Sequence, residues 1–223
     1  MIKSYCIESD TWLDLGCGHQ LLPPWRYREE KKLMQKCKVV AGLDADLNSL
    51  RNHRTIKNRI RGDICVIPFA NDSFDVITAN MVFEHLQYPE IQLAEIYRVL
   101  KPRGRLIFHT PNIFGYTTII ARLMPNVIKA RLAYLLENRK KEDVFPTYYK
   151  MNSKSRIEKL AQKGGFRVEK IRMILSSAEF AMIPPLVLIE LIWIRILMGR
   201  RLRMLRTNII AQLKKPQKVI HSD

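Results

Sequence analysis

A short apolar segment that ends in two closely spaced glycines constrains the fold of this chain more than any other feature. Thr11 to Leu15 has the composition of a buried strand, and Gly16 and Gly18 close it. Glycine lets the backbone turn sharply and approach a ligand closely, and the helix that follows such a turn offers unpaired N–H groups. The segment therefore predicts a strand that ends at a ligand-binding loop.

The chain continues with alternating strand and helix patterns. Further apolar runs predict buried strands at residues 39–43, 74–79 and 105–109. Composition or spacing predicts helices at residues 25–34, 48–54 and 89–101. This alternation predicts an α/β fold with a doubly wound, mostly parallel sheet and helices on both faces. Ligands bind such sheets at the carboxyl edge, where Gly16, Gly18, Asp44 and Asp63 should converge.

The second half of the chain should complete the sheet and cover its edge. An alternating strand is predicted at residues 166–175 after a helix at 153–163, and residues 207–213 are the best candidate for the last strand. With 223 residues, the chain is long enough for a single domain with a full core. The segments 114–150 and 176–206 follow strands that end at the carboxyl edge, so we expect both insertions to lie over the ligand site.

Polar residues around the glycine loop indicate which ligand it holds. A dinucleotide-binding loop has a third glycine where this chain has Leu21. Asp14 would repel a phosphate and suits a cation better. A ligand with an ammonium, a carboxylate and a ribose would use Asp14, the loop amides and Asp44, because vicinal hydroxyls pair well with an acceptor-only carboxylate. S-adenosylmethionine carries all three groups.

Four motifs in order resemble the class I S-adenosylmethionine-dependent methyltransferases of the ubiquinone-biosynthesis-like type. LDLGCG resembles the first motif, VVAGLDAD the second, RGDICVIPFANDSFDVITANMVFEHL the adenine segment and fourth strand, and EIYRVLKPRGRLIFHTPN the following helix and fifth strand. The resemblance covers residues 11–112. It implies a seven-stranded Rossmann-like sheet with an antiparallel last strand, S-adenosylmethionine as the cofactor, and methyltransferase activity.

The resemblance also implies a set of cofactor-binding residues. Asp44 would bind the ribose, Asp63 and Ile64 the adenine, and Asn80 and Met81 would lie near the methionine portion. The full implied set is Asp14, Gly16, Cys17, Gly18, Asp44, Ala45, Asp63, Ile64, Asn80 and Met81. Asp63 could instead only cap a turn, and Asp46 and Asp72 are interpreted as turn residues without a ligand role.

Two departures from the family pattern concern the cover of this site. Gln20 stands where the family often has a glycine, and residues 1–10 leave almost no room for the helix that usually precedes the first strand. We therefore expect either a weak affinity for the cofactor or a lid formed by another segment of the chain. An inactive scaffold with a methyltransferase fold is the alternative that these departures leave open.

The net charge of +17 and one apolar insertion point to a membrane surface. Residues 180–198 are nearly all apolar, but Glu190 and Arg195 interrupt them, so a monotopic or peripheral contact through residues 180–206 is expected rather than a crossing. The basic residues nearby are Arg195, Arg200, Arg201, Arg203, Arg206, Lys214, Lys215 and Lys218. Anionic lipids attract such residues. A buried helix, a dimer surface and a nucleic-acid contact are the alternatives.

Other features of the composition bear on the compartment. Four widely spaced cysteines, Cys6, Cys17, Cys37 and Cys65, predict neither a disulfide framework nor a metal site. The N-terminus lacks the pattern of a secretory signal peptide. We expect a cytoplasmic protein on the inner face of the membrane.

Two histidines are candidates for the catalytic base. Methyl transfer to an oxygen usually requires removal of its proton, and histidine titrates near neutral pH. His85 follows the fourth strand and His109 ends the fifth, so both should lie at the carboxyl edge, although a structural role is as compatible with His85 and the pattern at His109 is weaker. Tyr148 and Tyr149 could contact the acceptor or pack in the core. We expect O-methylation of an amphipathic or lipid-linked biosynthetic intermediate, with RNA methylation as the first alternative.

Overall fold

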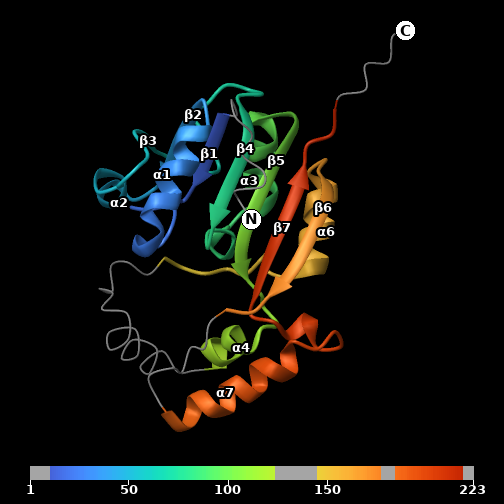
Figure 1. Cartoon of the computed structure of the whole chain (residues 1–223). Coiled ribbons are helices and arrows are strands. Elements are labelled where there is room, and N and C mark those ends of the chain that lie inside the picture. Colours follow the sequence, from blue (N-terminus) through green and yellow to red (C-terminus); the bar gives the residue numbers. More distant parts are fainter. Residues whose placement is uncertain (1–10, 124–144, 177–183, 218–223) are drawn as a thin grey trace.

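A seven-stranded sheet forms the centre of the molecule (Figure 1). The computed structural model describes residues 11–123, 145–176 and 184–217. The strands are β1 (Thr11–Leu15), β2 (Val39–Asp44), β3 (Asn58–Arg61), β4 (Phe74–Asn80), β5 (Leu100–Pro111), β6 (Arg167–Ile174) and β7 (Asn208–Lys214), in the spatial order β3-β2-β1-β4-β5-β7-β6. Strands β1 to β5 pair in parallel, and β7 pairs antiparallel to both β5 and β6. The predicted doubly wound fold with an antiparallel last strand is confirmed.

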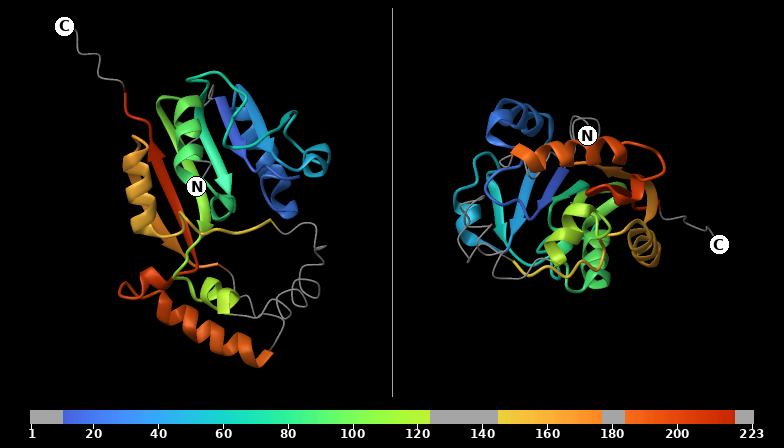
Figure 2. Two further views of the ribbon diagram at one scale, coloured as in Figure 1. Left: turned by 180° about the vertical axis from the view of Figure 1, so that it is seen from behind. Right: turned by 90° about the horizontal axis from the view of Figure 1, so that it is seen from below.

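Helices cover both faces of this sheet, as the two further views show (Figure 2). One face carries α1 (Tyr27–Lys36) and α2 (Leu47–Arg51), and the other carries α3 (Pro89–Val99) and α6 (Lys154–Lys163). Asp46 caps α2 by accepting hydrogen bonds from the amides of Asn48 and Ser49, and Ser153 caps α6. The predicted role of Asp46 as a turn residue agrees with this cap. Asp72 has φ +54° and pairs with Lys215, 2.7 Å from its ammonium.

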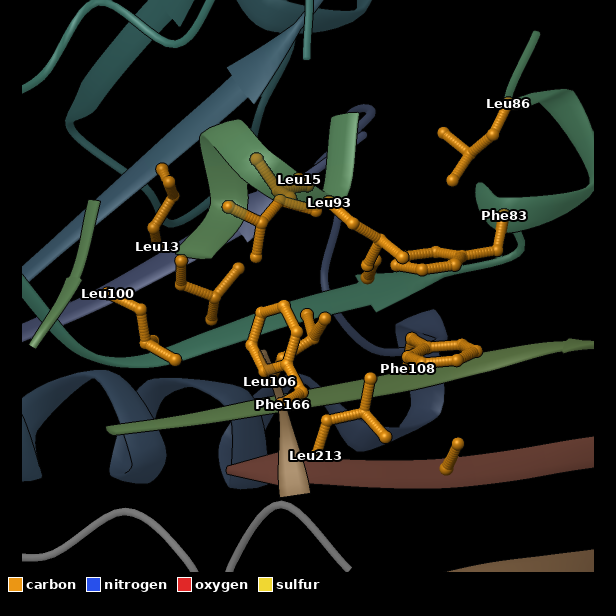
Figure 3. Close-up of a cluster of buried hydrophobic side chains, with 14 of the residues drawn as sticks. Leu13, Leu15, Phe83, Leu86, Leu93, Leu100, Leu106, Phe108, Phe166 and Leu213 are labelled. Atoms are coloured by element: carbon orange, nitrogen blue, oxygen red, sulfur yellow. The ribbon is translucent and has the colours of Figure 1, made fainter. Parts of the chain in front are cut away.

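Two apolar clusters fix the strands in place. The larger lies between the sheet and α3 and α6, and includes Leu13, Leu15, Leu93, Leu106 and Leu213 (Figure 3). There Phe83, in the short helix η3 (Phe83–His85), stacks on Phe108 with ring centroids 3.8 Å apart. The smaller cluster surrounds Trp12 on the opposite face. Because Phe83 follows β4 directly, its burial pins the loop that closes the carboxyl edge.

Three boundaries differ from those expected from the sequence. The edge strand β3 was not predicted, because its four residues are mostly exposed and polar and show no apolar run. Pro102–Gly104 was expected to separate a helix from a strand, but α3 ends at Val99 and β5 already begins at Leu100, with Arg103 at φ +67°. Helix α2 ends at Arg51, three residues earlier than predicted.

Two helices, which we call the distal layer, lie beyond the carboxyl edge of the sheet (Figures 1 and 2). They are α4 (Tyr116–Leu123) and α7 (Pro184–Leu197). At 14 residues, α7 extends about 21 Å, less than the hydrocarbon core of a bilayer. Among the described residues, no helix has the length and hydropathy needed to cross a membrane. Residues 145–149, which we call the strap, run between the distal layer and the sheet edge (Figure 1).

Candidate functional site

The glycine loop after β1 has the geometry that its sequence predicts. Gly16 and Gly18 have φ of +62° and +56°, values that favour glycine. A Cβ atom on Gly16 would lie 2.4 Å from Cγ2 of Val82, so a side chain there would collide with the loop after β4. The backbone of the loop therefore runs close to the loop after β4, across the mouth of the site.

Asp44, at the end of β2, holds the glycine loop from the side. Its carboxylate accepts hydrogen bonds of 2.8 Å from the amide of Gly18 and 2.9 Å from the amide of Asp46. Carboxylate oxygens have several lone pairs, so these bonds leave acceptor capacity for a ligand. Asp63 accepts from the amide of Cys65 at 2.8 Å, so the turn-capping interpretation of Asp63 holds, although its side chain also borders the cavity described next.

The larger part of the predicted site lines a cavity of about 410 Å³ at the carboxyl edge. The predicted residues that border it are Gly16, Asp44, Ala45, Asp63, Ile64, Met81 and His85. Met81 has φ +56° and is partly exposed. We call this the adenosyl cavity, because the residues that the resemblance assigns to ribose and adenine gather around it.

All but one of the remaining predicted residues line a second cavity of about 470 Å³, which also borders Gly16. Its predicted members are Asp14, Gly16, Cys17, Asn80 and His109. Gly18 borders neither cavity, and acts on the site through its bond to Asp44. Burial, with the nearby charges of Asp14 and Asp44, raises the pKa of the Cys17 thiol to about 12, so this cysteine is a packing residue rather than a nucleophile.

Asp14 is the most perturbed acid of the site. It is buried on β1 and accepts a short hydrogen bond from the hydroxyl of Thr78, which in turn accepts from the Trp12 indole at 2.6 Å. Burial raises the pKa of Asp14 from 3.8 to about 7, the Thr78 bond opposes the rise, and the charges of Asp44 and Glu30 add to it. A cationic ligand group would relieve this cost. Sequence reasoning missed Thr78, although its place on the Asp14 face of the adjacent strand could have indicated it.

The strap closes the adenosyl cavity from the side of the distal layer. Phe145, Pro146 and Tyr148 border the cavity, and the amides of Tyr148 and Tyr149 donate to the carbonyl of Glu84 at 2.8 and 3.1 Å. Nδ1 of His85 lies 2.8 Å from the carbonyl of Pro146. The strap therefore covers the adenosyl cavity on this side.

Glu84, which precedes His85 in η3, is a buried acid. Its carboxylate accepts from the hydroxyl of Thr110 at 3.1 Å, and Thr110 accepts from the Asn152 amide at 2.7 Å, in a buried chain behind the strap. Burial raises the pKa of Glu84. Within the described ranges, no group of three or more His, Cys, Asp or Glu side chains is arranged to hold a metal ion.

His109 and Asn80 form a pair in the second cavity. Nδ1 of His109 lies 2.8 Å from Oδ1 of Asn80, across the adjacent ends of β5 and β4. Nε2 of the same ring is buried and has no hydrogen-bond partner. Burial lowers the pKa of His109, so the ring is neutral near pH 7.

Known proteins share the fold of this chain, and some also share the sequence of its first half. Solved methyltransferases superpose over nearly the whole chain, among them an S-adenosylmethionine-dependent methyltransferase from Methanosarcina mazei (TM-score 0.61, 16% identity, 97% of each chain) and one from Mesorhizobium loti (TM-score 0.59, 16% identity, 96% of this chain and 95% of that chain). The fold is that of the class I S-adenosylmethionine-dependent methyltransferases.

The sequence identifies the domain more closely. Residues 13–108 match the family described as a methyltransferase domain. A demethylmenaquinone methyltransferase from Renibacterium salmoninarum is 34% identical over 40% of this chain and 41% of its own length, and a malonyl-[acyl-carrier protein] O-methyltransferase from Methylococcus capsulatus is 33% identical over 38% and 30%. The chain thus spans less than half the length of these curated relatives. Residues 13–108 are therefore similar to a methyltransferase domain, on a fold shared with solved S-adenosylmethionine-dependent methyltransferases.

Proposed function

We propose that this protein transfers the methyl group of S-adenosylmethionine to an oxygen of an amphipathic or lipid-linked acceptor while it lies on an anionic, cytoplasmic membrane face. The cofactor supplies a methyl group on a sulfonium, whose leaving group is neutral. The protein then has to bind the cofactor and the acceptor, orient them for transfer, and exclude water. The names of the relatives support an acceptor of this kind, since one acts on demethylmenaquinone and another on a malonyl group carried by a protein.

The residues at the carboxyl edge fit the cofactor. Asp44 would hold the ribose hydroxyls, Asp63 and Ile64 the adenine, and Asp14 the ammonium group. The fit rests on chemistry already in the structure: Gly16 leaves no room for a side chain, and Asp14 is a buried carboxylate without a cationic partner among the described residues. The carboxylates of Asp14, Asp44 and Asp63 offer acceptors where the cofactor has donors, and the backbone amide of Ile64 would donate to the adenine.

The observation that carries the membrane proposal is the apolar surface of the distal layer. Leu188, Ile189 and Ile192 of α7 are 64%, 65% and 63% exposed, and Leu123 of α4 is 79% exposed. Further exposed apolar side chains on these two helices are Leu186, Leu191, Ile196, Ile119 and Ile120. These side chains form a larger apolar surface than the single exposed residues that are normal on a soluble protein. Within a single copy of this chain α7 is not a buried helix, contrary to one of the alternatives.

The charge next to this surface suits anionic lipid. Arg195, Arg200, Arg201 and Arg203 are exposed at the end of α7 and in the turn after it. Three other basic residues of the predicted set have structural partners instead. Arg206 donates to the carbonyls of Leu197, Met198 and Met173, Lys215 is buried with Asp72, and Lys214 lies 3.6 Å from Glu169. Lys218 lies outside the described residues.

Flotation with lipid vesicles tests the membrane contact. We expect binding to vesicles with about 30% phosphatidylglycerol, and much weaker binding to vesicles of phosphatidylcholine alone. Reversing Arg200, Arg201 and Arg203 to glutamate should weaken binding at least about tenfold, since each basic residue contributes about 1 kcal/mol. The matched control reverses three basic residues away from the distal layer, Lys163, Arg167 and Lys170. An equal loss of vesicle binding in both variants would mean that binding depends on the net charge of the protein and not on the arginines beside the distal layer.

Transfer of labelled methyl into lipid, RNA and protein fractions of the source cell tests the reaction. Label in the lipid fraction that disappears in Asp14→Asn and Asp44→Ala is the expected result. Label in RNA would reassign the arginines to phosphates. No label, together with no cofactor binding, would identify an inactive scaffold.

A further inference from the structure

The second cavity has a composition that the cofactor alone does not explain. Beyond Asp14 and the glycine loop, it extends to the ends of β4, β5 and β7 and is mostly apolar. Its apolar lining comprises Leu21, Leu22, Pro23, Leu33, Ala79, Ile107, Phe108 and Ile210. The adenosyl cavity already contains the residues assigned to ribose and adenine, and the two cavities share Gly16. The second cavity therefore offers space for another, largely apolar molecule beside the cofactor.

Two buried polar atoms without partners belong to residues that line this cavity. They are Nε2 of His109 and Oε1 of Gln20. A buried polar atom that lacks a hydrogen bond costs free energy, and native proteins leave few of them unless a ligand or a reaction uses the atom. With Asp14, three groups of this cavity can accept a hydrogen bond from a ligand, while the guanidinium of Arg26, which also borders the cavity, is paired with Glu29 at 2.9 Å. Its ligands should bring donors, such as an ammonium and a hydroxyl.

Asn80 determines which nitrogen of His109 carries the proton. The carbonyl oxygen of an amide only accepts, so the 2.8 Å contact between Oδ1 of Asn80 and Nδ1 of His109 requires a proton on Nδ1. Nε2 then carries the lone pair. Nε2 of His109 can therefore act as a base, and Asn80 holds the ring in the required tautomer. In other sites, too, a second group fixes the tautomer of a catalytic histidine.

His85, the other candidate, has a different environment. Its Nδ1 proton also has an acceptor, the carbonyl of Pro146, but that contact ties η3 to the strap. Its ring borders the adenosyl cavity and packs edge-on against Phe145, with centroids 6.1 Å apart. His85 therefore holds the cover of the cofactor site.

We propose that the second cavity binds the methyl acceptor, a hydroxyl compound with an apolar body, and that Nε2 of His109 takes the hydroxyl proton during transfer. This inference rests on the proposed function. The acceptor oxygen forms a bond to the methyl carbon while the bond from that carbon to sulfur breaks and its electron pair stays on sulfur. The oxygen–hydrogen pair of electrons stays on oxygen, and the proton moves to Nε2. Asn80 is a positioning residue, because it acts through the tautomer of His109.

A pair of probe compounds tests this assignment without turnover. The protein is loaded with S-adenosylhomocysteine, and calorimetry compares 4-hexylphenol with 4-hexylanisole, which lacks the hydroxyl proton. We expect the phenol to bind at least about tenfold more tightly, because only it satisfies Nε2. The preference should fall to about one in His109→Leu and persist in His19→Leu, which changes an exposed histidine outside both cavities. An equal affinity of the wild type for both probes, or an unchanged preference in His109→Leu, would overturn the proposal.

Nitrogen-15 NMR of the imidazoles supplies a second measurement should His109→Leu fail to fold. The wild type should show the Nδ1-protonated tautomer for His109, with a shift of the Nε2 signal when 4-hexylphenol binds. Asn80→Ala should give a mixture of tautomers and a reduced preference for the phenol. An unchanged Nε2 signal on binding would contradict the inference. Because these readouts need no methyl transfer, a failure of the proposed function would appear in the labelling experiment instead.

Discussion

The carboxyl edge of the sheet, which we call the cofactor edge, and the distal layer lie on either side of the strap. They differ in whether polar or apolar side chains face their surroundings. At the cofactor edge, the carboxylates of Asp14, Asp44 and Asp63 all accept hydrogen bonds from neighbouring loops or strands. In the distal layer, α7 exposes its apolar residues and buries its one acid, Glu190. The polar groups of the first region border two cavities, whereas the second region exposes apolar side chains on its surface.

The first prediction compares Asp44, proposed to bind the ribose, with Asp46, which only caps α2. Asp44→Ala should weaken cofactor binding by at least about 100-fold, because it removes both the acceptor for the ribose and the bond that holds Gly18. Asp46→Ala, two residues away, removes only the cap of α2. It should lower the free energy of unfolding by about 1 kcal/mol and change cofactor affinity by less than about threefold. Calorimetric titration with S-adenosylhomocysteine measures both, and similar affinity losses would show that the loop responds to any local damage.

The second prediction compares the two glycines of the loop. Gly16→Ala combines a left-handed φ with a Cβ atom 2.4 Å from Val82, so we expect a loss of about 2–3 kcal/mol in unfolding free energy. Gly18→Ala has a left-handed φ but no atom within 4 Å of the new Cβ, and should lose only about 1 kcal/mol. Urea denaturation at constant pH measures the difference. Equal losses would mean that backbone strain alone governs the loop.

The third prediction concerns the pH dependence of cofactor binding. The ammonium of the cofactor favours ionised Asp14, whose pKa is about 7 in the free protein. Affinity should therefore fall about fivefold from pH 7 to pH 6, and Asp14→Asn should bind weakly with no such slope. Measurements stay below pH 7 because α-amino groups themselves titrate at about 7.7–8.0. A wild-type affinity that is flat over this range would exclude Asp14 as the partner of the ammonium.

The same pKa shift has a consequence for stability, with the opposite sign. The unfolded chain loses the Asp14 proton near pH 3.8 and the folded chain near pH 7, so the folded state is penalised progressively as pH rises between these values. Asp14→Asn should therefore stabilise the cofactor-free protein at pH 8, by about 2 kcal/mol, and have little effect at pH 4. Thermal unfolding at the two pH values checks this. The result would mark Asp14 as a residue kept for binding at a cost in stability.

The glycine loop and the end of β2 could be predicted from the sequence because the constraints on them are local. Gly16 and Gly18 need left-handed backbone, Asp44 ends an apolar strand, and both requirements are readable within a few residues. The pairing of Asn80 with His109 was not readable, since it depends on the register of β4 against β5. The strap was equally hidden, because only the fold brings Tyr148 to the carbonyl of Glu84.

The prediction for the basic residues after α7 was partly wrong. Sequence position grouped Arg206, Lys214 and Lys215 with the exposed arginines, but each has a specific partner in the fold. Lys215 shows why charge alone cannot be assigned to a surface: its ammonium donates to Asp72 and to the carbonyls of Tyr97 and Leu100. Composition counts charges, whereas burial and hydrogen bonding decide which of them a partner can meet.

The most local of the predicted effects tests whether the distal layer opens separately from the rest. The hydroxyl of Tyr116 in α4 donates to buried Glu190 of α7 at 2.7 Å. Tyr116→Phe removes this bond to a carboxylate and should cost about 1–2 kcal/mol, confined to the distal layer. Hydrogen exchange should then show faster opening of α7 while amides of β1 and β4 keep their protection. Uniform acceleration in α7 and in both strands would instead mean that the distal layer and the sheet unfold as one unit, and that the two regions are coupled more tightly than their chemistry indicates.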